Sequence, residues 1–444
     1  MKRWLHDTAV SRALLIFITL RLFFSGWAIV ANLLSPVPTT PDEGIRPYLG
    51  EPQLSQGVAG LLLGPWQRFD TQHYLRIARQ GYADESDSVF PPLYPWLVRG
   101  VSALGGGGPT ARLAAALLIA NLATCGLFIL LHKVVTAELG PEAATRTLVY
   151  LAVFPTSFFL FSAYTESLFL LLALGSFWAG KNGRFPLAGL LGFLAAATRL
   201  TGWVLVVPLA YFAIGSRLPI NGNRSSVNGN PLAVKGSHTR FTVHRLRFTD
   251  YVSRITDYVS RFTNYISRFT VHDLRFTLYH LLCAALPGLA LVLFMAYRWW
   301  LGLPPLPVIY ERYWYQTTGF PGQDIFTAVN TLCCGGAARS NEPFQLTLDL
   351  ACTLLLLGAT YAAFRRLGVG YGLYALLLLV FMLLPTSPVK PLYSFSRYAL
   401  AFFPLFMLLG VWGQRPLLNR LILYPSLMLA LFCSGQFFIW GWVA

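Results

Sequence analysis

The chain has 444 residues, of which 55% are hydrophobic and only 12% are charged. Soluble domains carry about 25% charged residues, so this composition excludes an ordinary soluble protein. The formal net charge of +16 would suit nucleic-acid binding, but ten basic and three acidic residues lie together between Arg217 and Leu278, and much of the remaining positive charge lies at the ends of apolar segments. Basic residues in such places are typical of membrane proteins, and we therefore expect no nucleic-acid partner.

Apolar runs of membrane-spanning length recur along the whole chain. A hydrocarbon core requires about 20 mostly apolar residues per helix. In chain order the apolar segments are 13–34, 109–131, 142–161, 164–180, 185–199, 201–216, 278–301, 346–364, 371–386, 398–413 and 420–443. They predict an all-α fold, a polytopic transmembrane helical bundle with about 11 spans, which forms a single domain over residues 1–444 within the lipid bilayer.

The distribution of basic residues predicts the orientation of this bundle. The chain begins Met1-Lys2-Arg3, and the apolar run that follows is too long for a signal peptide, so we expect a first span with a cytoplasmic N-terminus. In that order every inner connection is basic, as the positive-inside rule requires. The large first extracytoplasmic loop, 35–108, then holds seven of the eighteen acidic residues.

Residues 217–277 form a low-complexity insertion that we expect on the cytoplasmic side. An Asn/Gly/Ser-rich stretch is followed by units of seven residues, each of which begins with an arginine: Arg240, Arg247, Arg254, Arg261, Arg268 and Arg275. One interpretation is a basic amphipathic segment on the inner leaflet. We favour the other, a tandem expansion in a loop that tolerates insertions, because long loops cost little free energy. In neither interpretation does this segment carry chemistry.

The loop 35–108 contains the segment most informative about chemistry, Trp66 to Tyr82. Apolar and aromatic residues recur there at helical spacing and predict a short helix along the membrane surface. Asp70 and His73 would share one face of this helix, where both could act on one substrate. Asp70 suits a general base that takes a proton from an acceptor hydroxyl, and His73 could orient the acceptor or bind phosphate. The alternative, in which Asp70 pairs with Arg68 or caps the helix, is equally compatible with the sequence.

Three further ionisable residues interrupt apolar segments: Glu166, Arg199 and Arg397. Such residues at membrane depth are costly and often functional, although an arginine that snorkels from a helix end is the alternative for each. In the predicted topology all three reach the same outer face as Asp70. Two arginines there could bind a lipid phosphate and stabilise it as a leaving group. Nucleotide sugars are generally unavailable outside the cytoplasm, so a lipid-phosphate sugar is the expected donor. Arg21, within the first span, has no assigned role.

At these residues the chain resembles the PIG-V family of GPI mannosyltransferases and its bacterial relatives, within the GT-C glycosyltransferase superfamily. The shared motifs are Phe69-Asp70, His73-Tyr74, Ile77-Ala78, Gly81-Tyr82, Phe90-Pro91-Pro92-Leu93-Tyr94-Pro95, Tyr164-Thr165-Glu166-Ser167, Thr198-Arg199 and Ser396-Arg397-Tyr398. The resemblance implies a GT-C-like fold and transfer of mannose from a polyprenyl- or dolichyl-phosphate donor to a lipid-linked or glycan acceptor. It places Asp70 in the catalytic role and adds Tyr74 and Tyr398 to the substrate-binding residues.

The chain also departs from the family pattern. Phe69 stands where the family often has tryptophan, and a single Asp70 replaces the adjacent acidic pair of some GT-C families, so no cofactor is predicted and a divalent metal is left open. No Cys or His spacing of a metal site is present in the sequence. The compact loops favour a bacterial member, which would lie in the plasma membrane, whereas a eukaryotic one would lie in the endoplasmic reticulum.

A polytopic transporter or lipid-carrier flippase is the rival interpretation, and a structural membrane scaffold is a further one. Transporters often have similar halves and broken helices with polar groups at mid-depth. The sequence shows no convincing similarity between its halves. If Asp70, Glu166 and Arg397 form one pocket the enzyme is favoured, and if they are widely dispersed a rival is favoured.

Overall fold

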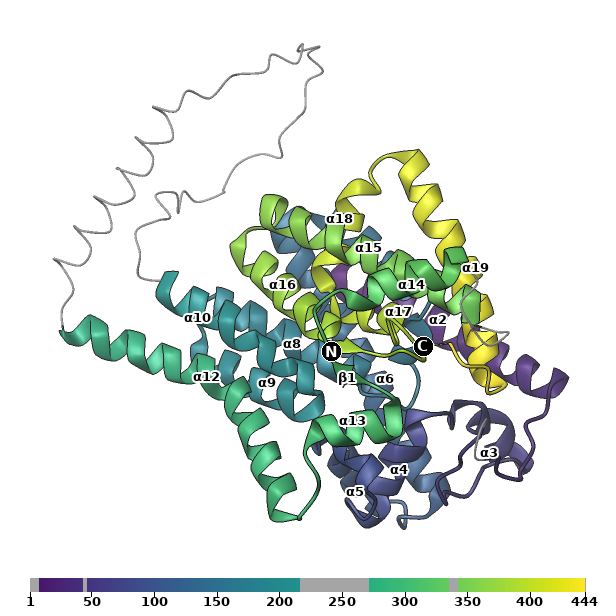
Figure 1. Cartoon of the computed structure of the whole chain (residues 1–444). Helices are drawn as coiled ribbons and strands as arrows, with labels where there is room; N and C mark the ends of the chain where they lie inside the picture. The colour runs from purple at the N-terminus through teal and green to yellow at the C-terminus, as the bar shows by residue number, and fades with distance from the viewer. Residues whose placement is uncertain (1–7, 43–45, 216–270, 335–341, 444) are drawn as a thin grey trace.

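The computed structural model describes residues 8–42, 46–215, 271–334 and 342–443, and these are almost entirely helical (Figure 1). Up to residue 215 the elements are α2 (Thr8–Leu34), α3 (Gly57–Leu62), η1 (Gly64–Trp66), α4 (Asp70–Gln80), η2 (Glu85–Val89), α5 (Leu93–Ala103), α6 (Pro109–Leu139), α7 (Pro141–Ala152), η3 (Ser157–Leu160), α8 (Glu166–Lys181), α9 (Phe185–Thr198), η4 (Leu200–Leu205) and α10 (Val206–Gly215). Here η denotes a short 3₁₀ helix.

The second part of the chain resumes at Val271. Its elements are α12 (Val271–Trp300), α13 (Leu306–Trp314), β1 (Thr317–Thr318), α14 (Gln323–Cys334), α15 (Glu342–Arg366), α16 (Val369–Leu383), β2 (Pro385–Thr386), α17 (Phe395–Tyr398), η5 (Ala399–Ala401), α18 (Phe403–Trp412) and α19 (Pro416–Phe438). The insertion predicted at 217–277 therefore lies outside the described residues, except for the positions from 271 onward that begin α12.

The structure confirms an all-helical membrane protein but not the predicted number of spans. Among the described residues, five helices are long and apolar enough to cross a membrane: α2, α6, α12, α15 and α19. A sixth span results if the segment from Phe395 to Ala401 and α18, which meet at an angle of 82°, count as one. The prediction of about 11 spans was based on apolar composition alone. Several of those segments fold instead as shorter helices of 10 to 16 residues: α7, α8, α9, α10 and α16.

The breaks between the shorter helices coincide with polar residues. Helix α8 begins at Glu166, α9 ends just before Arg199, and Arg397 lies in the four-residue helix α17. A helix rises about 1.5 Å per residue, so a helix of 10 to 16 residues is too short to cross the hydrocarbon core alone. The charged residues that the sequence analysis singled out therefore mark points where the chain turns inside the bundle.

The central helices pack closely because small residues face their neighbours. Helix α9 lies between α8 and α12, and α6 contacts α7 and α8. On α9, a side chain at Gly189 would collide with the backbone of Cys283 on α12, and one at Gly192 would collide with Pro287. Small residues at helix contacts let backbones approach closely in membrane proteins. This packing holds the ends of α8 and α9 in place.

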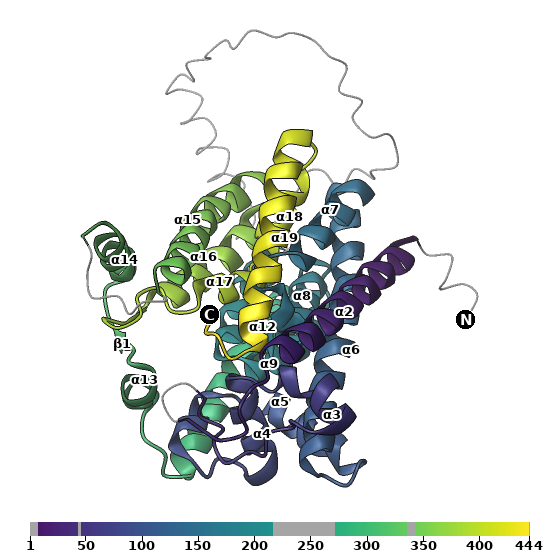
Figure 2. The ribbon, with the colours of Figure 1, turned by 90° about the vertical axis from the view of Figure 1, so that its right-hand side faces the viewer.

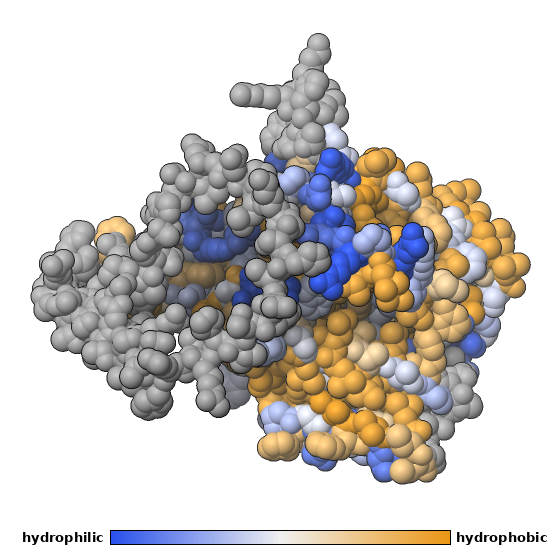
Figure 3. All heavy atoms as spheres, turned by 90° about the horizontal axis from the view of Figure 1, so that it is seen from above, coloured by the Kyte–Doolittle hydropathy of each residue, from blue (hydrophilic) through white to orange (hydrophobic). Residues whose placement is uncertain are grey.

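The outer surface of the bundle is strongly apolar. Large hydrophobic side chains are exposed along α2, α12 and α19, among them Leu15, Leu22, Leu293, Leu421 and Met428. Seen from above, apolar residues cover much of the visible surface (Figure 3). Helices α2 and α19 contact each other and meet near the lower end of α19 in Figure 2, where Trp27 Nε1 donates a hydrogen bond to the Leu431 carbonyl at 3.0 Å. Exposed apolar area of this extent is typical of contact with lipid.

The segment from α13 to α14 is connected to the segment before Arg397. Strand β1 pairs antiparallel with β2, with Thr317 opposite Thr386. The carboxylate of Asp324, on α14, accepts hydrogen bonds from the backbone N–H groups of Ser387 and Leu392, both at 3.1 Å to Oδ2. These contacts fix the loop that leads into α17, and thereby the position of Arg397.

Candidate active site

Asp70 is the first residue of helix α4, which lies in the segment where the helical spacing predicted a short helix. The residue before it, Phe69, has φ +47° and ψ −118°, a backbone conformation that residues other than glycine rarely adopt. The backbone N–H of Asp70 donates to the Tyr164 hydroxyl at 3.3 Å. A carboxylate at this end of a helix is favoured by the helix dipole. The turn at Phe69 thus directs Asp70 toward the interior of the bundle.

Arg397 joins Asp70 to Glu166. Its Nη2 lies 2.8 Å from Asp70 Oδ2, and its Nε lies 2.7 Å from Glu166 Oε1. The guanidinium also lies over the rings of Phe159 and Tyr164, each 5.2 Å from the ring centre. Arg397 is 7% exposed. One buried cation therefore holds two carboxylates that are far apart in the sequence.

Arg199 extends this chain of ion pairs. Its Nη1 lies 2.5 Å from Glu166 Oε1 and donates to Thr165 Oγ1 at 3.2 Å. The ring of Tyr398 lies 5.4 Å from the Arg199 guanidinium carbon and 5.7 Å from that of Arg397. The other oxygen of Glu166, Oε2, is buried and has no hydrogen-bond partner among the described residues.

Helix ends position three of these four charges favourably. Asp70 and Glu166 each occupy the first position of a helix, where negative charge is stabilised, and Arg199 caps the end of α9, where positive charge is stabilised. Two carboxylates and two guanidinium groups balance in formal charge. The cluster can therefore persist in a buried place, and it keeps two arginines that an anion could bind.

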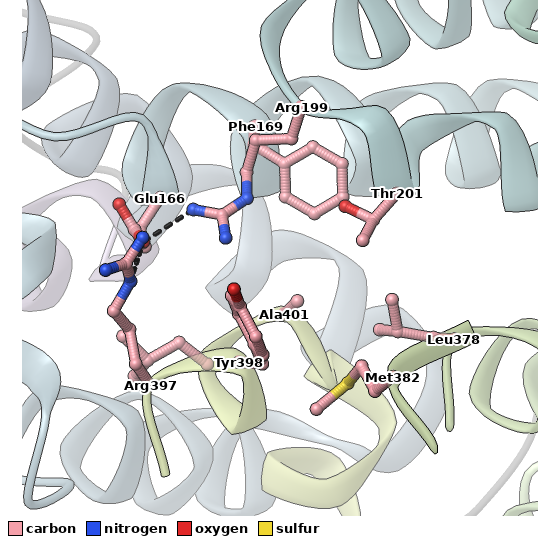
Figure 4. A pocket seen from close by; sticks show the side chains of 10 residues that line it. Glu166, Phe169, Arg199, Thr201, Leu378, Met382, Arg397, Tyr398 and Ala401 are labelled. Atoms are coloured by element: carbon pink, nitrogen blue, oxygen red, sulfur yellow. Dashed lines mark hydrogen bonds and ion pairs between the residues drawn. The ribbon is translucent and has the colours of Figure 1, made fainter. Parts of the chain in front are cut away.

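A pocket opens beside this cluster (Figure 4). The pocket is partly open to the surroundings. Glu166, Arg199, Arg397 and Tyr398 form its polar part, and the remaining lining residues are Phe169, Thr201, Leu378, Met382, Leu400 and Ala401. The pocket thus combines cations with an apolar wall, which are the two properties that a lipid phosphate requires.

His73 has partners of its own. Its Nδ1 lies 2.8 Å from Asp87 Oδ1, and its ring lies between those of Phe90 and Trp314, at 4.9 and 6.0 Å between ring centres. Asp87 is fully buried and also binds Arg76, at 2.8 Å from Nε to Oδ2. A joint action of Asp70 and His73 on one substrate remains a prediction.

Asp87→Asn is expected to destabilise the protein. Removal of this carboxylate charge leaves the Arg76 guanidinium, which is 9% exposed, without its closest counter-charge. Loss of one partner from a buried ion pair costs about 3–5 kcal/mol. Thermal unfolding in detergent should show a clearly lower midpoint than for Asp84→Asn, because the Asp84 side chain is 43% exposed and its pairing with Arg76 is worth at most about 1 kcal/mol. Equal midpoints for the two variants would contradict this assignment.

The two tyrosines predicted to bind substrate lie in different surroundings. Tyr398 lines the pocket next to both arginines. Tyr74 is 2% exposed, and its hydroxyl lies 3.3 Å from Thr165 Oγ1 while its ring contacts that of Tyr164 edge to face. Tyr74 therefore supports the residue that precedes Glu166, and a direct contact with substrate is not evident from its burial.

The simple alternatives for Asp70 and Arg397 are wrong. Arg68 does not pair with Asp70: its guanidinium is buried and donates to the carbonyl of Phe438 at 3.0 and 2.8 Å. Burial lowers the pKa of Arg68 to about 9. The cap position of α4 is Phe69, not Asp70. Glu166 and Arg397 are 5% and 7% exposed and bind each other, so Arg397 does not snorkel toward water. Arg21 faces the interior, where it donates to the Phe161 carbonyl at 3.2 Å.

Sequence reasoning missed Asp87, Thr165 and the supporting role of Tyr164. Asp87 lies fourteen positions from His73, a separation that no helical or strand period connects. Thr165 and Tyr164 stood inside the quoted motif, so their place next to Glu166 could have suggested contact with the cluster. The described residues contain no group of three or more His, Cys, Asp or Glu that could hold a metal ion, and both carboxylates of the cluster bind arginine.

Fold and site together define a multi-pass integral membrane protein with a buried cluster of carboxylates and arginines beside an apolar pocket. The family model described as mannosyltransferase (PIG-V) matches residues 31–224, which include Asp70, Glu166 and Arg199. Over this region the chain is similar to the PIG-V mannosyltransferase family. Arg397 lies beyond the matched region.

Curated relatives agree with this family. The chain is 32% identical over 152 residues to GPI alpha-1,6-mannosyltransferase 2 of Rattus norvegicus. This alignment covers 33% of this chain and 31% of that protein. For the protein of the same name from Homo sapiens the identity is 31% over 160 residues, with 34% and 32% covered. The matches thus span about a third of the length of these relatives.

Two solved structures are similar to the whole chain at low identity. One is ArnT from Cupriavidus metallidurans bound to undecaprenyl phosphate, with a TM-score of 0.42, 15% identity, and 96% of this chain and 76% of that chain covered. The other is the oligosaccharyltransferase of Archaeoglobus fulgidus, with a TM-score of 0.40, 12% identity, and 94% and 53% covered.

Proposed function

We propose that this protein is a GT-C-type glycosyltransferase that moves a mannosyl group from a polyprenyl- or dolichyl-phosphate donor to a hydroxyl of a lipid-linked or glycan acceptor, on the extracytoplasmic face of the membrane. The observation that carries the proposal is the Asp70–Arg397–Glu166–Arg199 chain of ion pairs beside an apolar pocket. The match of the mannosyltransferase (PIG-V) family model to residues 31–224 supports mannose as the sugar.

Arg199 and Arg397 are the proposed phosphate ligands. Guanidinium groups match phosphate oxygens in a fork of two hydrogen bonds, and both line the pocket. The apolar side chains of Phe169, Leu378 and Met382 would contact the prenyl chain next to the phosphate. Because Arg397 now binds Asp70 at 2.8 Å, an arriving phosphate competes with this carboxylate for the same guanidinium. Donor binding would thereby release Asp70 for its role as a base.

Transfer is then a single displacement at the anomeric carbon of the sugar. The acceptor oxygen forms a bond to this carbon while the bond from the carbon to the phosphate oxygen breaks. Asp70 takes the proton of the acceptor hydroxyl, and the polyprenyl phosphate leaves with its negative charge stabilised by the two arginines. The proton, the sugar and the leaving group are all accounted for without a further reactant.

The remaining predicted residues would bind the acceptor and the sugar. Asp87 holds the His73 ring by its Nδ1 and thereby fixes the direction of the other ring nitrogen, which could position an acceptor hydroxyl. Glu166 Oε2 lacks a partner among the described residues and can accept a hydrogen bond from a substrate hydroxyl. Tyr398 would close the pocket next to the phosphate. Tyr74 would act through Thr165.

The direct test is transfer of labelled mannose from polyprenyl-phosphate mannose in membranes that contain this chain. We expect a labelled lipid or glycan product that membranes without the chain do not form. Nucleotide-linked mannose should give no labelled product in sealed vesicles whose extracytoplasmic face is on the inside, because this donor cannot cross the membrane to the proposed site. Movement of the lipid-linked sugar across vesicles without any transfer product would instead favour the flippase.

A further inference from the structure

The segments directly before Asp70 and Arg397 share an unusual backbone. Phe69 has φ +47°, Leu392 has φ +55° and Ser394 has φ +63°. A fourth non-glycine residue of this kind, Trp440 with φ +64°, lies just after α19. Residues other than glycine adopt this region rarely, and they stay there when the surrounding structure holds them.

Residues 437–443 cover the turn that precedes Asp70. The Phe69 ring lies 5.9 Å from that of Phe437, 5.0 Å from that of Trp440 and 5.3 Å from that of Trp442, measured between centres. The guanidinium of Arg68 donates twice to the Phe438 carbonyl and lies over the Trp440 ring. The turn at Phe69 is thus enclosed by aromatic rings and anchored by a buried arginine.

The same segment reaches the turn that precedes Arg397. The Trp442 ring lies 5.5 Å from that of Tyr393, which stands between Leu392 and Ser394. The Lys390 ammonium lies 4.3 Å from the centre of the Trp442 ring, within the range of a cation–π contact. Trp442 therefore contacts both turns at once, although they are separated by more than 300 positions in the sequence.

We propose that residues 437–443 position Asp70 and Arg397 relative to each other, with Trp442 as the positioning residue that joins the two turns. This inference rests on the proposed function, in which phosphate displaces Asp70 from Arg397 and the two side chains must remain aligned. Trp442 touches neither side chain and is not catalytic. It complements Tyr164, which is buried and contacts the Asp70 N–H and the Arg397 guanidinium. Trp442 is 39% exposed, so its replacement should leave the core intact.

The kinetic test compares Trp442→Ala with Trp442→Phe and with a matched control, Trp299→Ala. Trp299 is 83% exposed on α12. We expect Trp442→Ala to lower kcat for mannosyl transfer on the order of tenfold to a hundredfold, because small misplacements of reacting groups have effects of this size. The donor KM should change less than kcat, because Arg199 and the apolar wall of the pocket stay in place. Trp442→Phe, which keeps a ring between the turns, should recover most of the rate.

A second measurement does not depend on activity. Hydrogen–deuterium exchange of the full chain in detergent should become faster in residues 66–72 and in residues 390–398 for Trp442→Ala, and should stay unchanged there for Trp299→Ala. If the wild type shows no transfer but exchange responds in this way, the proposed function fails and the positioning role stands.

Three outcomes would overturn the positioning role. They are a kcat of Trp442→Ala indistinguishable from that of Trp299→Ala, unchanged exchange in both turns, and equal loss of rate in the Phe and Ala variants. If Trp442→Ala does not accumulate as folded protein, Trp442→Leu keeps apolar bulk without the ring and is measured in the same two ways. The same outcomes then decide.

Discussion

Asp70→Asn is expected to abolish mannosyl transfer while the protein still folds. The amide has the same shape and can still accept a hydrogen bond from Arg397, which also keeps its contact with Glu166 at 2.7 Å. The amide cannot take the proton of the acceptor hydroxyl. General bases contribute about 10²- to 10⁴-fold, so kcat should fall at least on the order of a hundredfold. Transfer from polyprenyl-phosphate mannose, at matched amounts of protein in membranes, measures this loss.

Glu85→Gln is the matched control for this charge removal. Glu85 lies in the same loop, has a side chain that is 39% exposed, and pairs with Arg312 on the surface. Exposed ion pairs contribute at most about 1 kcal/mol, so this variant should transfer as the wild type does. A fully active Asp70→Asn protein would exclude Asp70 as the base. Loss of activity in both variants would point to the loop as a whole.

The charged residues of the cluster could be found from the sequence because ionisable groups stand out in an apolar context. Asp70, Glu166 and Arg397 come together in one cluster, which is the outcome that was expected to favour an enzyme over a transporter or scaffold. The ion-pair partners themselves could not be predicted. Composition shows that a charge is buried, but the choice between Arg68 and Arg397 as the partner of Asp70 depends on long-range packing.

The turns between the short helices and the contacts between distant segments could not be predicted from the sequence either. Apolar composition predicted helices correctly but did not show that the chain turns at Glu166 and Arg199, so short helices were counted as spans. The aromatic contacts of Trp442 join segments from distant parts of the chain and follow no period. The pairing of Asp87 with Arg76 and His73 has no signal in spacing either.

Arg397→Lys is expected to lower transfer strongly although it keeps the positive charge. Arg397 uses two different nitrogens, Nη2 toward Asp70 and Nε toward Glu166, and its flat guanidinium lies over two aromatic rings. A lysine ammonium is a single point at the end of a flexible chain and cannot occupy both positions. We expect kcat to fall on the order of a hundredfold and the donor KM to rise, because phosphate binding and the alignment of Asp70 both depend on this fork. Kinetics at varied donor concentration separate the two effects.

Arg366→Lys, at an exposed position near the end of α15, controls for the loss of a guanidinium and should be as active as the wild type. Arg199→Lys gives a comparison with a smaller expected effect, because Arg199 pairs with Glu166 but not with Asp70. This variant should mainly raise the donor KM.

The double variant Asp70→Asn with Arg397→Lys then tests whether Arg397 acts through Asp70. If it does, the two losses are not additive, because an arginine that aligns the base has less to contribute once the base is gone. Additive losses would mean that Arg397 serves the donor phosphate alone and does not align the base.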